Sequence, residues 1–410
     1  MNIADGLKKE QCTGCGLCSQ ICPAKCIVMI ENSEGFLYPK VDSESCVHCD
    51  LCVNKCPILS DGVLSHDEQY PQYYDAINKN EEELKRASSG GVFSALANII
   101  LRDGGYVCGC VYNEQMDAVH VLSNNRNTIM RMYGSKYVQS NISNCFYDIR
   151  GKLQNGVKVL FTGTACQVAA LKSYLGKEDE NLYTVDILCH GVPSPGLFRL
   201  FVNCLNKKYN HRVVDIKFRD KEKKGWGSEH RTSVLYDNGK KIWPFMPAYF
   251  SAFFYGLNLR ESCYQCRFAG TNRVSDLTIG DFWGSWQKYG KRFKEGISVI
   301  SINSDKGNVL FTRIQETFSF VEKLSQQEAI CSNDNFYHPV KRPKERDSFY
   351  IDLTKYKLCA KRTYFAKTYR KKILASFYGA VIPERIRIKL HVFLHCLKGR
   401  TSNNRIKNDL

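Results

Sequence analysis

The sequence predicts a small α+β domain fused to a larger α/β domain with a mixed sheet, followed by a basic helical tail. Three observations lead to this division. Nine of the 20 cysteines lie within residues 12–56 and repeat one spacing twice. Strand-like and helix-like patterns alternate through residues 70–335, as in α/β folds. Positive charge is concentrated in residues 341–410. We therefore expect a cysteine-rich head over residues 1–60, a body over residues 70–335 and a tail over residues 341–410.

Composition and the N-terminus indicate the kind of compartment. The chain has 410 residues, and its hydrophobic share of 43% suits a protein that buries a core. Residues 1–9 mix charges and lack the apolar stretch of a secretory signal. No apolar run is long enough to span a membrane. We expect a cytoplasmic protein, in which clustered cysteines are metal ligands rather than disulfides.

Most of the net charge of +17 belongs to the tail. Residues 341–410 contain 19 Lys and Arg against 5 Asp and Glu, a net +14, so the preceding residues carry +3. The head contains five Lys against seven acidic residues, a net −2. Because no base-stacking or recognition module accompanies the charge, we do not expect a nucleic-acid partner.

The head contains two cysteine runs with the spacing C-x2-C-x2-C-x3-C-P. In such runs the first three cysteines surround one [4Fe-4S] cubane, whereas the fourth ligates the other cluster. We expect each fourth cysteine to start a short helix that points at that other cluster. Zinc also binds C-x2-C pairs, but a zinc site needs neither the third cysteine of each run nor the proline after the fourth. The spacing therefore favours two [4Fe-4S] clusters. The predicted ligands are Cys12, Cys15, Cys18 and Cys56 for one cluster and Cys46, Cys49, Cys52 and Cys22 for the other.

The residues between and around these ligands have predicted roles as well. Gly14 and Gly16 let the backbone approach the first cluster and turn amides toward its sulfurs. Residues 27–41 are typical of a β-hairpin. We expect His48 to lie at the surface or behind the ligands rather than among them, and Cys26 to be a packed spare.

The body is predicted to interleave strands and helices around a mixed sheet. A turn at residues 237–239 predicts a further hairpin. The expected strands are 73–77, 106–112, 157–161, 182–188, 277–279 and 298–302, and the expected helices are 92–102, 143–153, 167–174 and 196–210.

Two segments of the body have the composition of cofactor contacts. Ser88, Ser89, Gly90 and Gly91 directly precede an expected helix, whose free amides and positive dipole end suit a pyrophosphate. Serine also caps helices without any ligand, and this motif alone does not decide between the two. Asp281 follows a short strand and stands before two aromatic residues. Aromatics at a turn can cover a flat ring, but they are more often core.

Four further cysteines lie at predicted element ends or in loops, where metal ligands usually lie. Together they predict a third four-cysteine site, and the spacing leaves open whether it holds a [4Fe-4S] cluster or structural zinc. The alternative is buried free cysteines beside half of a zinc site. The four are Cys166, Cys189, Cys263 and Cys266.

The body resembles the coenzyme F-420 hydrogenase/dehydrogenase beta-subunit family over roughly residues 70–330. The resemblance is carried by Ser-Gly-Gly-Val-Phe at 89–93, Tyr-Gly-Ser-Lys-Tyr-Val-Gln-Ser at 133–140, Gly-Thr-Ala-Cys-Gln at 163–167, Cys-His-Gly-Val-Pro-Ser-Pro at 189–195, Cys-x2-Cys-Arg-Phe at 263–268 and Gly-Asp-Phe-Trp-Gly at 280–284. It implies FAD and a third [4Fe-4S] cluster, the latter on Cys166, Cys189, Cys263 and Cys266. It also implies Ser88, Ser89, Gly90 and Gly91 on the flavin pyrophosphate, with Lys136, Tyr137 and Asp281 near the ring, and Lys136 and Asp281 in catalytic roles.

A flavin fits this set of centres because it exchanges single electrons with clusters and electron pairs with hydride carriers. We expect an iron–sulfur flavoprotein oxidoreductase whose flavin exchanges hydride with a coenzyme F-420-like deazaflavin or NAD(P)H. Its clusters would exchange electrons with a redox partner protein, a ferredoxin or another oxidoreductase subunit. The alternatives are a ferredoxin-linked flavin reductase acting directly on an organic substrate, such as a surface-polysaccharide intermediate, and a non-catalytic electron-carrier subunit.

The tail contains one predicted helix, over residues 383–399, which starts with proline and ends with glycine. The helix has an apolar face and a cationic face, which favours a helix that packs its apolar face on the body and leaves its cationic face in solvent. Peripheral contact with an anionic inner membrane surface is an alternative, and an acidic partner is another.

Overall fold

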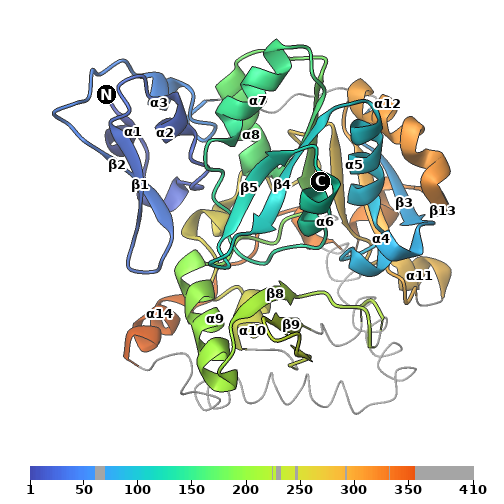
Figure 1. Ribbon diagram of the computed structural model, residues 1–410. Helices are drawn as coiled ribbons and strands as arrows, with labels where there is room; N and C mark the ends of the chain where they lie inside the picture. The colour runs from blue at the N-terminus through green and yellow to red at the C-terminus, as the bar shows by residue number, and fades with distance from the viewer. Residues whose placement is uncertain are drawn as a thin grey trace, which may run out of the picture.

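The protein consists of a head, a large sheet domain and a small aromatic-rich sheet region (Figure 1). The computed structural model describes residues 1–60, 70–223, 225–227, 232–244, 248–290, 293–331 and 333–355. The head (blue) lies beside the large sheet, and the small sheet lies below both in this view. In the described ranges no helix is long and apolar enough to cross a membrane.

The head contains the predicted hairpin. Strands β1 (Ile27–Glu31) and β2 (Leu37–Val41) pair antiparallel, with Ile27 opposite Val41. Short helices surround them: α1 (Ile3–Gly6), the 3-10 helix η1 (Lys9–Gln11), α2 (Leu17–Ile21) and α3 (Leu51–Asn54).

The expected helix start at the fourth cysteine of each run is wrong. α2 begins after left-handed Gly16 (φ 74°) and ends at Cys22, and α3 begins after left-handed Asp50 (φ 58°) and stops before Cys56. The physical reason is the proline behind each fourth cysteine, which disfavours helical backbone at the residue before it. Each helix therefore contains the third cysteine of its run, and the fourth cysteine follows it.

The large domain is built on a mixed eight-stranded sheet with the order β13-β3-β12-β11-β7-β6-β4-β5. The four neighbours β11, β7, β6 and β4 are parallel to one another, and each strand outside them pairs antiparallel with its neighbours. This confirms the predicted α/β fold with a mixed sheet. The strands are β3 (Gln72–Asn78), β4 (Tyr106–Tyr112), β5 (Ala118–Ser123), β6 (Val159–Thr164), β7 (Leu182–Ile187), β11 (Leu277–Asp281), β12 (Ser298–Ile302) and β13 (Phe318–Leu324).

Helices cover both faces of this sheet because successive strand side chains point to opposite sides. Leu160 of β6 belongs to the core under α5 (Val92–Arg102) and α12 (Asp305–Ile314), whereas its neighbours Val159 and Phe161 belong to the core under α7 (Cys145–Gln154) and α8 (Ala165–Leu175). The remaining helices of this domain are α4 (Glu81–Arg86), α6 (Arg126–Met132), α11 (Ser285–Tyr289), α13 (Gln326–Ile330), η3 (Gln315–Thr317) and η4 (Asp334–Phe336).

The small region has a core of aromatic rings. Helix α9 (Pro195–Tyr209) and helix α10 (Ala248–Phe254) pack on a three-stranded sheet through Phe198, Phe218 and Tyr249. The sheet consists of β8 (Val213–Lys217), β9 (Ser233–Tyr236) and β10 (Lys241–Ile242), so the hairpin predicted at residues 237–239 is confirmed. The 3-10 helix η2 (Glu261–Gln265) leads from this region back to the large domain.

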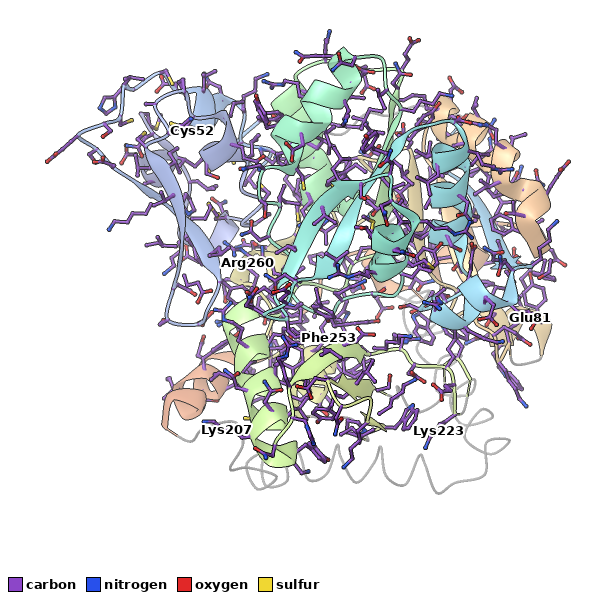
Figure 2. All side chains as sticks on the ribbon, in the orientation of Figure 1. Cys52, Glu81, Lys207, Lys223, Phe253 and Arg260 are labelled. Carbon is purple, nitrogen blue, oxygen red and sulfur yellow. The ribbon has the colours of Figure 1, made fainter. Side chains whose placement is uncertain are left out.

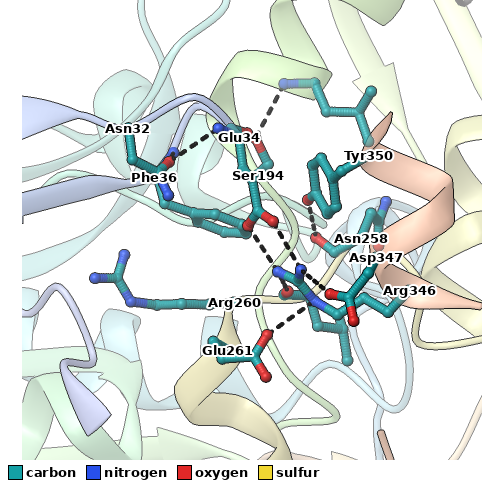
Figure 3. Close-up of polar contacts among 12 residues, drawn as sticks. Asn32, Glu34, Phe36, Ser194, Asn258, Arg260, Glu261, Arg346, Asp347 and Tyr350 are labelled. Atoms are coloured by element: carbon teal, nitrogen blue, oxygen red, sulfur yellow. Dashed lines mark hydrogen bonds and ion pairs between the residues drawn. The ribbon is translucent and has the colours of Figure 1, made fainter. Parts of the chain in front are cut away.

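The start of the basic region docks on the head and the body. Arg346 at the start of α14 (Arg346–Lys355) is 2% exposed and pairs with Glu34 of the head hairpin at 2.7 Å and with Glu261 at 3.2 Å (Figure 3). Its guanidinium also donates to the carbonyl oxygen of Leu259. The helix expected over residues 383–399 lies outside the described residues.

Candidate functional site

Two cavities in the head each gather one predicted ligand set. The outer cavity is lined by Cys22, Cys46, Cys49 and Cys52 together with Met1, Cys26, Val47, His48 and Leu51. The inner cavity is lined by Cys12, Cys15, Cys18 and Cys56 together with Cys52, Leu17, Met29 and Ile58. Each set joins three cysteines of one run to the fourth cysteine of the other, in the crossed pairing typical of two-cluster ferredoxins.

The two loops around these cavities repeat the same backbone conformation. Gly14 (φ 67°) and Gly16 (φ 74°) are left-handed in the first run, and His48 (φ 52°) and Asp50 (φ 58°) are left-handed at the corresponding positions of the second. Left-handed backbone is favourable for glycine and strained for other residues. The second loop therefore keeps the shape of the first at a conformational cost, as expected if the shape serves the same ligand.

The two residues predicted not to be cluster ligands, His48 and Cys26, lie at the outer cavity. His48 is exposed. Cys26 is buried, as expected for a packed spare, and its sulfur lies 3.4 Å from the sulfur of Cys22. Both line the outer cavity without belonging to either predicted ligand set.

The two cavities differ in what surrounds them. Met1, Val47 and Cys49 at the outer cavity are exposed. At the inner cavity, Leu17 belongs to the same hydrophobic core as α7 and α8 of the large domain, and Cys15 and Ile58 pack against that core. The outer cavity therefore faces solvent and the inner cavity faces the body.

Three of the four cysteines of the inner cavity, Cys12, Cys18 and Cys56, are buried, and Cys15 is half-buried. Burial, with a smaller contribution from the neighbouring Cys56 and Cys12 sulfurs, raises the pKa of Cys15 to about 12. A buried group of thiolates needs compensating positive charge, which the iron of a cluster supplies. The donor set and its burial fit an iron–sulfur cluster.

The four cysteines of the predicted third site come together from three segments. Cys166 lies in the first turn of α8, Cys189 follows β7, and Cys263 and Cys266 lie in and directly after η2. They are close enough for their charges to act on one another: burial, and after it the charge of Cys263, raises the pKa of Cys189 to about 12. Cys266, Cys189 and the head residue Cys15 similarly raise the pKa of Cys166.

Hydrogen-bond donors surround these sulfurs. The backbone N–H of Gly191 donates to Cys189 Sγ at 3.3 Å, and that of Val192 donates to Cys263 Sγ at 3.5 Å. In the described part of the chain, no three Cys, His, Asp or Glu side chains are close enough to hold a single metal ion. The role of these four cysteines as ligands stays a prediction.

The Ser88–Gly91 segment is tied into the sheet. The Gly90 N–H donates to Ser298 Oγ at 2.9 Å, and its carbonyl accepts from the Asn78 N–H. A Cβ at Gly90 would lie 2.1 Å from the Ala76 carbonyl oxygen, so packing alone requires glycine there. Left-handed Gly91 (φ 78°) precedes α5, which has no side-chain cap. The first turn of α5 therefore offers backbone N–H donors that suit an anion, whereas the Gly90 N–H already donates to Ser298.

Lys136 and Tyr137 have structural contacts of their own. The Lys136 ammonium donates to the carbonyl oxygens of Arg131 (2.7 Å) and Tyr133 (3.1 Å), and burial lowers its pKa to about 8. The Tyr137 ring packs 4.9 Å from Phe253 and 5.1 Å from Phe250 in the aromatic core. The residue before Lys136, Ser135, donates its N–H to Ser88 Oγ, which joins two predicted flavin segments.

Asp281 lies in a buried charged cluster that sequence reasoning missed. Its carboxylate accepts from Trp226 Nε1 at 2.9 Å and pairs with Arg219 at 3.3 Å. The Arg219 side chain is 6% exposed, and in the described structure its Nη2 is buried without a hydrogen-bond partner.

Lys221 and Trp283 complete this cluster. Lys221 donates to the carbonyl oxygen of Ser89 at 2.9 Å, and burial lowers the pKa of Lys221 to about 7. Trp283 stacks on Trp226 with ring centres 4.9 Å apart. Arg219 and Lys221 lie within ordinary polar sequence, so no motif marks them.

Comparison with known proteins covers both parts of the chain. Residues 11–58 match the 4Fe-4S dicluster domain, and residues 156–325 match the family described as the C terminus of the coenzyme F-420 hydrogenase/dehydrogenase beta subunit. The second range contains Cys166, Cys189, Cys263, Cys266 and Asp281, whereas residues 88–91 and 136–137 lie before it.

Two further comparisons complete these findings. No curated protein matches the chain. A chain of the F-420-reducing [NiFe] hydrogenase complex from Methanosarcina barkeri, solved as a xenon derivative, is similar at 18% identity with a TM-score of 0.44, over 72% of this chain and 92% of that one. The two matching ranges include all eight head cysteines and the four cysteines around η2. The chain therefore carries an N-terminal 4Fe-4S dicluster domain, followed by a region of the type found at the C terminus of the coenzyme F-420 hydrogenase/dehydrogenase beta subunit.

Proposed function

We propose that the protein is an iron–sulfur flavoprotein that relays electrons between the head clusters and an FAD in the body. The flavin exchanges hydride with a soluble two-electron carrier, a deazaflavin of the coenzyme F-420 type or NAD(P)H. One observation carries the proposal: Cys15 of the inner cavity packs against the same hydrophobic core as Cys166 and Cys266. The inner cluster and the third four-cysteine site are thereby neighbours.

The docking of the head supports a fixed path for electrons. Gln139 Nε2 donates to the Thr13 carbonyl oxygen at 2.9 Å, and Ser173 Oγ donates to the Lys55 carbonyl oxygen at 2.6 Å. Gly35 and Gly196 approach so closely that a Cβ on Gly35 would lie 2.5 Å from the Gly196 Cα. These contacts hold the inner cavity against the body. The outer cavity stays exposed to solvent, where a redox partner protein can exchange electrons with it.

In this proposal Cys166, Cys189, Cys263 and Cys266 hold a third [4Fe-4S] cluster, which transfers single electrons. The chain contributes N–H groups from Gly191 and Val192 to the ligand sulfurs. Hydrogen bonds of this kind influence cluster potential.

The flavin would lie where the Ser88–Gly91 segment, the Lys136 segment and the Asp281 cluster meet. When bound, FAD supplies the exchange between single electrons and hydride. The first turn of α5 offers amides to the pyrophosphate, and the free Nη2 of Arg219 offers one further donor to an anionic group. Lys136 holds a positive charge at a fixed position because two carbonyl oxygens bind its ammonium.

Anaerobic purification of the full chain, with iron, sulfide and flavin quantified, tests the proposal. We expect about twelve irons and one FAD per chain, at four irons per cubane. Replacing Cys166 by serine should remove about four irons, while the matched control Cys331→Ser, at an exposed cysteine outside the three predicted ligand sets, should remove none. About eight irons without flavin would indicate an electron-carrier subunit and refute the proposal.

The donor then needs to be identified. Reduced deazaflavin, NAD(P)H and reduced ferredoxin are tested separately for reduction of the bound flavin. Reduction by a hydride carrier supports the proposal. Reduction by ferredoxin alone, with turnover of an added organic substrate, would instead indicate the ferredoxin-linked reductase.

A further inference from the structure

Arg260 is a buried cation that joins the head to the body. It is fully buried and immediately precedes η2 (Figure 2). Its Nε donates to the Cys12 carbonyl oxygen at 2.6 Å, and its Nη2 donates to Cys12 Sγ at 3.6 Å. Its Nη1 donates to Gln139 Oε1 at 3.1 Å. The guanidinium therefore touches the backbone and the sulfur of a predicted ligand of the inner cluster.

The surroundings of Arg260 are shaped to admit a guanidinium at this point. The Tyr38 ring centre lies 4.1 Å from its Cζ and the Phe36 ring centre 5.6 Å from it. A Cβ on Gly14 would lie 2.6 Å from its Nη1, so only glycine there leaves room for the arginine. Gly14 is thus required by its positive φ and by this contact together.

Arg260 lacks a carboxylate partner among the described residues, although buried charges are costly unless paired. By contrast Arg346, another buried arginine that contacts η2, pairs with Glu34 and Glu261. The negative group that Arg260 touches is Cys12 Sγ. A cubane held by four thiolates is anionic, so a cluster in the inner cavity supplies the negative partner for the positive charge of Arg260.

The backbone of the same residue supports the third four-cysteine site. The Cys263 N–H donates to the Arg260 carbonyl oxygen at 3.0 Å, and the Arg260 N–H donates to the Val192 carbonyl oxygen at 3.0 Å. Val192 in turn donates its N–H to Cys263 Sγ. One residue therefore contacts the inner cluster loop with its side chain and the Cys263 segment with its backbone.

We propose that Arg260 is a positioning residue that raises the reduction potential of the inner cluster and holds Cys12 against the Cys263 segment. The sign follows from electrostatics: reduction adds negative charge to the cluster, and a donor and a positive charge at Cys12 Sγ stabilise the reduced form. The inference rests on the dicluster head and not on the proposed flavin.

The test measures the midpoint potentials of the head clusters in the full chain by redox titration followed by electron paramagnetic resonance. In Arg260→Gln we expect one head potential to fall and the other to stay unchanged. Arg260→Lys, which keeps a charge without the forked geometry, should show a smaller fall. Arg267→Gln is the matched control, because Arg267 donates to the carbonyl oxygens of Pro57, Ile58 and Ser60 at the same boundary and, among the described residues, to no sulfur. Its head potentials should fall less than those of Arg260→Gln, because its charge acts without a hydrogen bond to a ligand sulfur.

Unchanged head potentials in an iron-replete Arg260→Gln would overturn the proposal. If that variant loses iron, the decision falls to the unmodified protein labelled with 15N-arginine. A 15N hyperfine coupling to a reduced head cluster that disappears in Arg260→Lys supports the contact, and its absence in the unmodified protein overturns it. Failure of the flavin proposal is seen separately, as missing FAD or missing third-site iron with intact head signals.

Discussion

Replacing Arg346 by methionine should separate the start of the basic region from the rest of the protein. The guanidinium makes two 2.7 Å hydrogen bonds to Glu34, one of 3.0 Å to the Leu259 carbonyl oxygen and an ion pair of 3.2 Å with Glu261 (Figure 3). Removal of one partner of a buried ion pair costs about 3–5 kcal/mol. The Glu34 and Glu261 side chains are 24% and 23% exposed, so water recovers part of their solvation.

We therefore expect Arg346→Met to lower the free energy of unfolding by about 2–3 kcal/mol, which corresponds to a fall in Tm of about 3 °C for a chain of 410 residues. The assay is thermal unfolding of the anaerobic full chain. Arg342→Met is the matched control: Arg342 pairs with Glu261 and Asp347 but is 35% exposed, and exposed pairs contribute about 0–1 kcal/mol.

A double-mutant cycle with Glu34→Gln isolates the pair itself. Since Arg346 and Glu34 share two hydrogen bonds, we expect a coupling energy above about 1 kcal/mol. Equal Tm changes in Arg346→Met and Arg342→Met, or additive effects of Arg346→Met and Glu34→Gln, would refute the reasoning that burial makes this pair strong.

Three further predictions concern the body. Gly90→Ala would place a Cβ 2.1 Å from the Ala76 carbonyl oxygen, so we expect the free energy of unfolding measured in denaturant to fall by about 1–3 kcal/mol; a neutral result would contradict the tight packing. Burial raises the pKa of Asp75 to about 6, so the folded state binds the proton more tightly than the unfolded chain, and the free energy of unfolding falls as pH rises from about 4 to 6. Asp75→Asn should abolish this pH dependence when unfolding is measured across that range. If the pH dependence is retained, it belongs to another group. Lys136→Met should change the flavin content or potential, and an unchanged flavin spectrum and potential would count against its role.

Much of the head was predictable because its information is local in sequence. The C-x2-C-x2-C-x3-C-P spacing determines which cysteines can share a cubane, and the two cavities contain the predicted crossed sets. The helix position was mispredicted because the left-handed backbone at Gly16 and Asp50 starts each helix before the proline ends it. Strands β5 and β13 were missed for a different reason: short or mixed-polarity strands become recognisable only beside the neighbours that they pair with.

The sequence by itself determined the cluster-binding head with its eight candidate ligands and the alternating body, since these follow from spacing and periodicity. The four further candidate ligands were predicted from their places at element ends and from the family resemblance. Only the tertiary structure decided that the inner cavity faces the body and the outer cavity faces solvent. It alone brought Arg260 to Cys12, 248 residues away, and Arg219 to Asp281. A buried charge is recognised by the partner that folding places beside it, and that partner leaves no pattern in the surrounding sequence.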